Sequence, residues 1–316
     1  MAESLPLDTA PIMAGRPFTR AEALADGIDA VAIRTLVRRG QIRRIVQGVY
    51  VDTGVQDSLE LRAEALVKVL PDDSVICRQS AAWLYGIDTA ALSDRSQVPR
   101  LEFVRPAKSR AVRTAGAGGH SQTLLGDDVV EIAGLRVTSP VATAVHLARH
   151  LRRPFALSAL DAMARARLVA AYQVREAVRR YPHHPYIVQA RELARVMDSR
   201  AESPGESWLR LRMIDAGFPP VVPQVEVRTP DQRFRVDLAF LHPLRDGRRL
   251  ALEYDSDLWH GTRRQQLRDA RRVRQIEAGG WVVLSIGRGQ VWGTDPALEN
   301  AVGDLLEVRP KLPRRW

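Results

Sequence analysis

The chain has 316 residues, of which 45% are hydrophobic and 27% are charged, a composition typical of a globular protein with two or three domains. No apolar run approaches the ~18 residues of a membrane span, and the first residues lack the pattern of a signal peptide. A single cysteine, Cys77, excludes internal disulfides and a cysteine-based zinc site. The sequence therefore predicts a cytoplasmic protein with no membrane partner.

The formal net charge is +10, and an excess of this size commonly neutralises nucleic-acid phosphates. Only three of the 47 basic residues are lysines, and an arginine bias also arises from coding-sequence composition alone. Charge alone leaves both explanations open. The distribution of the arginines along the chain is more informative.

Residues 18–51 contain the signals of two short helices followed by a hairpin. Thr19 and Glu22 have the T-x-x-E spacing of a capping box, and Asp29 can cap a second helix. The β-branched residues on both sides of Gln47-Gly48 predict a two-stranded hairpin. This order of elements predicts a winged helix-turn-helix.

Between Asp29 and Val51 the chain carries five basic residues and no acidic residue. They are Arg34, Arg38, Arg39, Arg43 and Arg44. Arg34 and Arg38 are four residues apart and share one helix face, which can enter a DNA groove while the wing contacts phosphates. A basic helix that is merely solvated is the alternative.

The stretch LVRRGQIRRIVQGVYV, residues 36–51, resembles the N-terminal winged helix of AbiEi-type antitoxins. The resemblance covers residues 15–70 and implies DNA as a partner, together with a toxin or a second copy of the chain. Residues 71–150 are similar to the mixed α/β segment that follows the winged helix in those antitoxins. Residues 151–200 have helical spacing and are expected to form a connector.

Residues 201–316 predict a separate domain with the element order α-β-β-β-α-β. A helix is expected to begin at Ser203, and Gly279-Gly280 to end the second one. The apolar stretches between and after them predict four strands. The expected fold class is thus α+β or α/β and multidomain, with a mixed sheet flanked by helices at the C-terminal end.

Three carboxylates lie on two of these strands. Asp237 is near the start of one strand, and Glu253 and Asp255 are near the end of the next, so a hairpin brings them together. Carboxylates this close repel one another, and burial adds a desolvation cost. A divalent cation such as Mg²⁺ removes both problems, accepts oxygen ligands and can activate a water molecule.

Six motifs in this region resemble the PD-(D/E)xK nuclease superfamily, in the branch of the very-short-patch-repair endonucleases. They are SPGE at 203–206, PQVEV at 223–227, VDLA at 236–239, LEYDS and WH within 252–260, RDARR at 268–272 and GWVVL at 280–284. The resemblance implies that Asp237 and Glu253 bind Mg²⁺ or Mn²⁺. It also implies that Glu206 contributes from the first helix and that His260 lies near the scissile phosphate.

One position departs from the superfamily pattern, because Asp255 stands where a lysine is usual. A positioned lysine would orient the attacking water. Either His260 or a second metal ion held by Asp255 replaces it, or catalysis has been lost. Two acidic residues also have simpler explanations: Glu206 completes a capping box with Ser203, and Asp269 forms an intrahelical ion pair with Arg272.

The sequence therefore predicts a DNA-binding protein with a metal-dependent endonuclease domain that hydrolyses phosphodiester bonds. The alternative is a non-catalytic transcriptional regulator or antitoxin with a degenerate nuclease fold. Asp237 and Glu253 favour the enzyme, and Asp255 favours the regulator.

Overall fold

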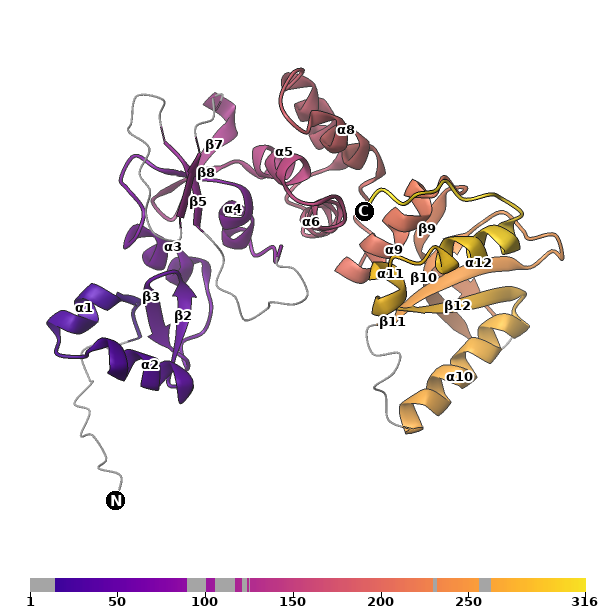
Figure 1. Ribbon diagram of the computed structural model, residues 1–316, viewed down its shortest axis with the longest axis horizontal. Helices are drawn as coiled ribbons and strands as arrows, with labels where there is room; N and C mark the ends of the chain where they lie inside the picture. Colours follow the sequence, from indigo (N-terminus) through magenta and orange to yellow (C-terminus); the bar gives the residue numbers. More distant parts are fainter. Residues whose placement is uncertain are drawn as a thin grey trace. The chain divides into compact units, whose positions relative to one another are not determined.

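The chain divides into two compact units, residues 1–147 and 148–316, in a computed structural model (Figure 1). The structure describes residues 15–89, 101–105, 117–120, 124, 126–229, 232–255 and 263–316. Within these ranges, every helix is too short or too polar to cross a lipid bilayer. The described residues form a mixed α/β molecule with three separate sheets.

The first unit begins with two short helices and a three-stranded sheet of order β1-β3-β2. These elements are β1 (Phe18–Thr19), α1 (Arg20–Ala25), α2 (Ala30–Arg38), β2 (Ile42–Val46) and β3 (Val49–Asp52). The predicted capping box is confirmed, because Glu22 N–H donates to Thr19 Oγ1 at 3.2 Å and Thr19 N–H donates to Glu22 Oε2 at 2.6 Å. The predicted cap of α2 is also confirmed, since Asp29 accepts the backbone N–H groups of Val31 and Ala32.

The predicted hairpin at Gln47-Gly48 is confirmed as well. Strands β2 and β3 pair antiparallel, and Gly48 has a φ of 82°, a left-handed conformation that a glycine adopts without strain. Ile42 and Val46 on β2 are buried, whereas Arg44 is exposed. The hairpin therefore buries an apolar face and presents a basic side chain to solvent.

A five-stranded sheet of order β6-β5-β4-β8-β7 completes the first unit. The strands are β4 (Val75–Ile76), β5 (Leu101–Val104), β6 (Ala117–His120), β7 (Val129–Ile132) and β8 (Leu135–Thr138). The helices in this part of the chain are α3 (Leu59–Val67), α4 (Arg78–Leu84) and α5 (Pro140–His150), whose last residues belong to the second unit. One hydrophobic cluster contains Ile45 and Val49 of the hairpin together with Leu66, Ile76 and Val137. The hairpin is thus packed onto the sheet that follows it.

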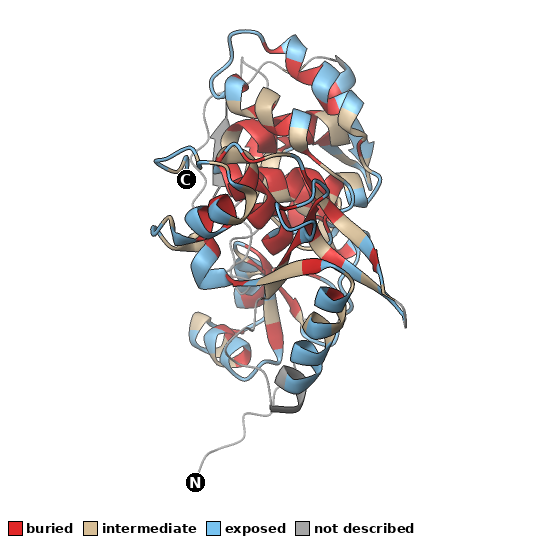
Figure 2. Ribbon diagram, turned by 90° about the vertical axis from the view of Figure 1, so that its right-hand side faces the viewer, coloured by how far each residue is buried: buried red, intermediate tan, exposed pale blue. Residues whose placement is uncertain are grey.

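The second unit consists of a layer of helices and a four-stranded mixed sheet of order β12-β11-β10-β9 (Figures 1 and 2). Its elements are α6 (Arg153–Arg165), α7 (Ala171–Ala177), α8 (Ile187–Val196), α9 (Pro204–Asp215), β9 (Val221–Arg228), β10 (Arg233–Phe240), β11 (Arg249–Asp255), α10 (Arg263–Ala278), β12 (Trp281–Gly287), α11 (Arg288–Trp292) and α12 (Ala297–Leu306). Only β11 and β12 are parallel. From α9 to β12, the order is the predicted α-β-β-β-α-β.

Helix α9 is the centre of the second unit and is buried on most of its circumference. Its arginines nevertheless point inward, because each meets a buried acid. Arg212 Nε donates to Glu299 Oε1 of α12 at 2.7 Å, and Arg210 Nη2 donates to Asp161 Oδ2 of α6 at 2.7 Å. Buried charges are tolerated only with partners of this kind.

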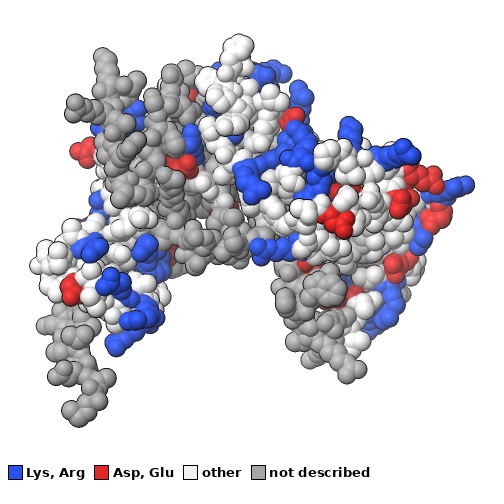
Figure 3. Space-filling view, viewed as in Figure 1, with Lys and Arg blue, Asp and Glu red and all other residues white. Residues whose placement is uncertain are grey.

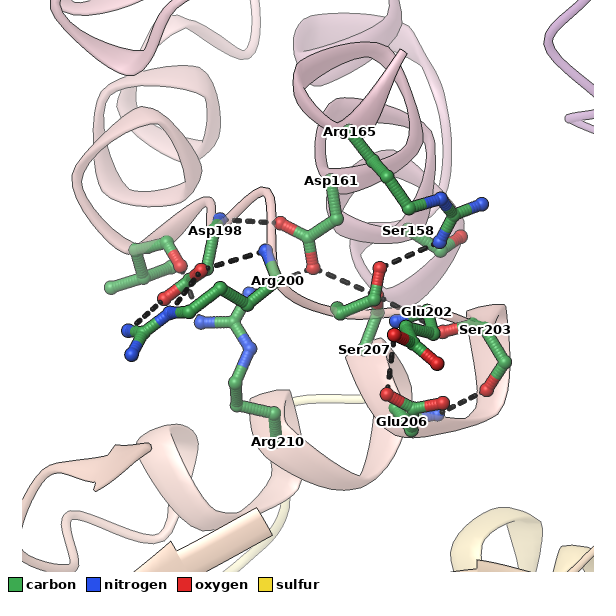
Figure 4. A network of polar contacts seen from close by, with 12 residues as sticks. Ser158, Asp161, Arg165, Asp198, Arg200, Glu202, Ser203, Glu206, Ser207 and Arg210 are labelled. Carbon is green, nitrogen blue, oxygen red and sulfur yellow. Dashed lines mark hydrogen bonds and ion pairs between the residues drawn. The ribbon is translucent and has the colours of Figure 1, made fainter. Parts of the chain in front are cut away.

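Asp161 is the hub of a polar network that ties the helical layer to α9 (Figure 4). Besides Arg210, its carboxylate accepts Ser207 Oγ at 2.7 Å and the backbone N–H of Asp198 at 2.7 Å. Burial raises the pKa of Asp161, although Arg210 and these hydrogen bonds oppose the shift. The first turn of α9, which carries Glu206, is therefore held in place by α6.

Candidate nucleic-acid interface and carboxylate cluster

The arginines around α2 lie on an exposed surface. Ile33 and Leu36 turn the other side of the helix into the core. Basic side chains gather over α2 and the hairpin in Figure 3. We call the exposed set the N-terminal basic surface: Arg34, Arg38, Arg39 and Arg44. Within the described part of the chain, none of these four guanidinium groups forms an ion pair.

Arg43, the fifth predicted DNA contact, has different surroundings. Its side chain is half-buried, and Nη2 donates to the carbonyl oxygen of Val55 at 3.1 Å. Arg44 is exposed, with its guanidinium 5.7 Å from the centre of the Tyr50 ring. Arg43 therefore fastens the segment after the hairpin, whereas Arg44 presents its charge to solvent.

The carboxylates predicted on the two C-terminal strands come together. The register pairs Leu238 of β10 with Leu252 of β11, so the next position places Asp237 opposite Glu253. The backbone N–H of Tyr254 donates to Asp237 Oδ2 at 2.9 Å. Asp255 ends β11, two residues beyond Glu253. His260 lies outside the described residues.

Glu206 joins this group from the first turn of α9. Its N–H donates to the N-cap Ser203, as the capping box predicts. Its side chain, however, accepts from the backbone N–H of Glu202 at 2.9 Å and from Gln224 Nε2 at 2.8 Å. Gln224 has a φ of 56° in the middle of β9, a left-handed conformation that is strained for a residue other than glycine.

Glu253 forms an ion pair with Arg272, the arginine that the sequence predicts to pair with Asp269. Arg272 Nη1 of α10 forms an ion pair with Glu253 Oε2, and Nη2 donates to the carbonyl oxygen of Arg235 at 2.7 Å. The predicted intrahelical pair with Asp269 is therefore wrong. Glu253 Oε1 is buried and has no hydrogen-bond partner within the described part of the chain.

The surroundings of Asp237 favour its neutral form. Burial, followed by the charges of Glu206 and Glu253, raises the pKa of Asp237 to about 6, against the opposing effects of the Tyr254 N–H and Arg272. The side chains of Glu206 and Glu253 are thus close enough to Asp237 to affect it electrostatically.

The donor chemistry suits a hard cation, but much of it is already in use. Asp237, Glu206 and Glu253 each give one oxygen to a hydrogen bond or an ion pair. Across the described residues, no three Asp, Glu, His or Cys side chains are grouped to bind a metal ion. The orphaned Oε1 of Glu253 is the one observation that fits a cation here.

Two family models match the chain. "Transcriptional regulator, AbiEi antitoxin" matches residues 13–51, and "AbiEi antitoxin C-terminal domain" matches residues 74–196. The chain therefore contains both kinds of AbiEi antitoxin domain. The expected likeness to AbiEi-type antitoxins is confirmed, and the second match runs past the expected limit of residue 150 to residue 196.

Two curated relatives come from Mycobacterium tuberculosis. Uncharacterized protein MT2308 of strain CDC 1551 / Oshkosh and Uncharacterized protein Rv2248 of strain ATCC 25618 / H37Rv are each 34% identical over 253 residues, which span 79% of this chain and 87% of each relative. The chain belongs to their family. The crystal structure of RV2827C protein from the same species is 15% identical, covering 71% of this chain and 86% of that one, with a TM-score of 0.32.

Only one of the two candidate sites lies within the residues that the family models match. The N-terminal basic surface lies within residues 13–51, the part that matches the transcriptional regulator model. The carboxylates Glu206, Asp237 and Glu253 lie beyond residue 196, where the second match ends. The basic surface therefore lies inside a matched AbiEi segment, whereas these three carboxylates lie outside both matches.

Proposed function

We propose that this protein is a DNA-binding transcriptional regulator of the AbiEi antitoxin type. The observation that carries the proposal is the N-terminal basic surface, four exposed arginines without acidic partners inside the segment that matches the regulator model. The nuclease activity that the sequence favours becomes the second candidate.

In this proposal residues 18–52 act as a winged helix-turn-helix. Helix α2 enters the major groove, where Arg34 and Arg38 reach base edges or phosphates. Arg44 on the hairpin contacts the backbone beside the groove. Because the hairpin shares a hydrophobic cluster with the following sheet, these groups are presented from a rigid support.

The antitoxin type also implies partners other than DNA. A toxin protein is one, and a second copy of the chain is another, because two copies would read a palindromic site with half-sites one helical turn apart. The symmetry of the DNA sites that the protein selects distinguishes one copy from two.

The test is selection of sheared genomic DNA by the full chain, followed by sequencing. We expect discrete enriched sites for the wild type and no enrichment for Arg34→Gln/Arg38→Gln. The variant Arg175→Gln/Arg195→Gln removes the same charge from exposed positions in the second unit and keeps the enrichment. Uniform recovery of all fragments by the wild type would overturn the regulator.

A metal-dependent nuclease is the second candidate, favoured by the orphaned Glu253 Oε1. Asp237 and Glu253 would bind Mg²⁺ or Mn²⁺, with Asp255 and Glu206 assisting. The bound cation would supply an acidified water and neutralise the scissile phosphate. Arg272 would have to release Glu253 Oε2, and His260 would serve as acid, base or phosphate contact.

This candidate is tested by incubating plasmid and duplex DNA with the protein and Mg²⁺ or Mn²⁺. Nicking by the wild type, together with intact DNA binding but no nicking by Asp237→Ala and Glu253→Ala, would establish it. A wild type that binds DNA and leaves nicked, mismatched and intact duplexes unchanged would exclude it.

A further inference from the structure

Helix α10 of the second unit carries a row of exposed arginines. Arg268, Arg271 and Arg274 are spaced three residues apart, so they lie within about 120° of the helix circumference and span about 9 Å along its axis. The acids of the helix, Asp269 and Glu277, fall outside this sector. We call the three arginines the α10 basic face, and Figure 3 shows basic side chains over this helix.

The orientation of this face is fixed by the opposite side of α10. Ile276 is fully buried and packs in one cluster with Val227, Val236 and Trp281 of the sheet. Arg272 bridges Glu253 and the carbonyl oxygen of Arg235. The helix is therefore anchored, and its outer face cannot rotate into the sheet.

The arginines on the strands near α10 have surroundings of a different kind. Three of them form ion pairs, Arg228 and Arg233 with Glu226 and Arg235 with Glu202, and Arg248, in the turn before β11, pairs with Asp246. Within the described part of the chain, the α10 basic face forms no ion pair. Three positive charges are thus held side by side on an anchored helix, with no acidic partner among the residues that the structure describes.

We infer that the α10 basic face is a second contact for the backbone of duplex DNA. The inference rests on the proposed function, which places DNA next to the first unit and so raises its concentration around the second. Arginines in this arrangement neutralise phosphates without reading sequence. The chain then binds DNA at two places, one that selects the site and one that adds affinity.

The test compares four full-length proteins by fluorescence anisotropy on a long duplex, over a range of salt concentrations. They are the wild type, Arg34→Gln/Arg38→Gln, Arg268→Gln/Arg271→Gln/Arg274→Gln, and the combination of both sets. Glutamine has nearly the helix propensity of arginine, so the exposed face is expected to fold normally, which circular dichroism checks. The variant Arg175→Gln/Arg195→Gln/Arg309→Gln removes the same charge elsewhere on the second unit.

We expect the α10 variant to bind about tenfold more weakly, and its plot of log K against log salt to be shallower by roughly 2 to 3. Both changes should be equal for a selected site and for random duplex. The Arg34/Arg38 variant should instead lose most of its preference for the selected site. The matched control should retain wild-type affinity.

The outcomes separate this inference from the proposed function. If the α10 variant and its control bind alike, the second contact is wrong, while loss of specificity in the Arg34/Arg38 variant still supports the regulator. If only the α10 variant loses binding, the second contact is correct and the regulator proposal fails. A loss seen with single-stranded RNA but not with duplex DNA would overturn the choice of partner.

Discussion

The arginines of α2 and those of α9 have opposite surroundings. Arg34 and Arg38 are exposed and have no acidic partner among the described residues. Arg210 and Arg212 are 3% and 2% exposed and are paired with Asp161 and Glu299. A net charge of +10 therefore does not measure a binding surface. What counts is whether an arginine meets an acid.

The largest expected effect is loss of the Arg212–Glu299 pair. Arg212→Met leaves Glu299 charged and buried, so the free energy of unfolding should fall by about 3 to 5 kcal/mol. Urea unfolding followed by tryptophan fluorescence measures this, because Trp208, Trp292 and Trp316 pack together in the second unit. The matched variant Arg34→Met on α2 should change stability by less than about 0.5 kcal/mol. Equal losses in the two variants would remove the distinction between these arginines.

A smaller effect is expected at the contact between α9 and β11. A Cβ atom at position 205 would lie 2.0 Å from Tyr254 Cε1, so Gly205→Ala must displace the ring or the helix. We expect a loss of about 1 to 3 kcal/mol in the free energy of unfolding. Gly289→Ala is the control, since open space surrounds that position. Unchanged stability of Gly205→Ala would mean that the two elements do not pack closely.

The smallest effect concerns pH and Asp237. Its pKa of about 6 exceeds the value in an unfolded chain, so between these two pKa values the folded state binds a proton that the unfolded state has released. The contribution of Asp237 to the free energy of unfolding therefore falls as pH rises through 6. Asp237→Asn removes that loss and should stabilise the metal-free protein by about 1 kcal/mol at pH 8, after allowance for solvent screening. The gain should vanish below about pH 4. Thermal unfolding at both pH values checks it, with the exposed Glu226→Gln as control.

Local sequence signals predicted much of this molecule. The caps at Thr19 and Asp29, and the turn at Gln47-Gly48, depend on residues at most a few positions apart, and each is present. The order of elements from α9 to β12 followed from apolar periodicity. Pairing of strands then brought Asp237 beside Glu253, as the hairpin predicted.

The remaining contacts depend on residues that are distant in the chain. Arg272 reaches Glu253 across the sheet rather than Asp269 on its own helix, because the burial of Glu253 makes that pair the stronger requirement. Gln224, whose backbone has a positive φ, donates to Glu206 from another element, β9. No spacing rule predicts either contact. The family matches support the regulator alternative better than the nuclease prediction.

The most direct measurement of the central claim is the affinity of the full chain for one selected duplex, for the wild type and Arg34→Gln/Arg38→Gln, between about 50 and 200 mM salt. If α2 contacts DNA, the variant should bind more weakly at every salt concentration, with a slope of log K against log salt shallower by about 2. Identical affinities and slopes for the two proteins would contradict the proposed function.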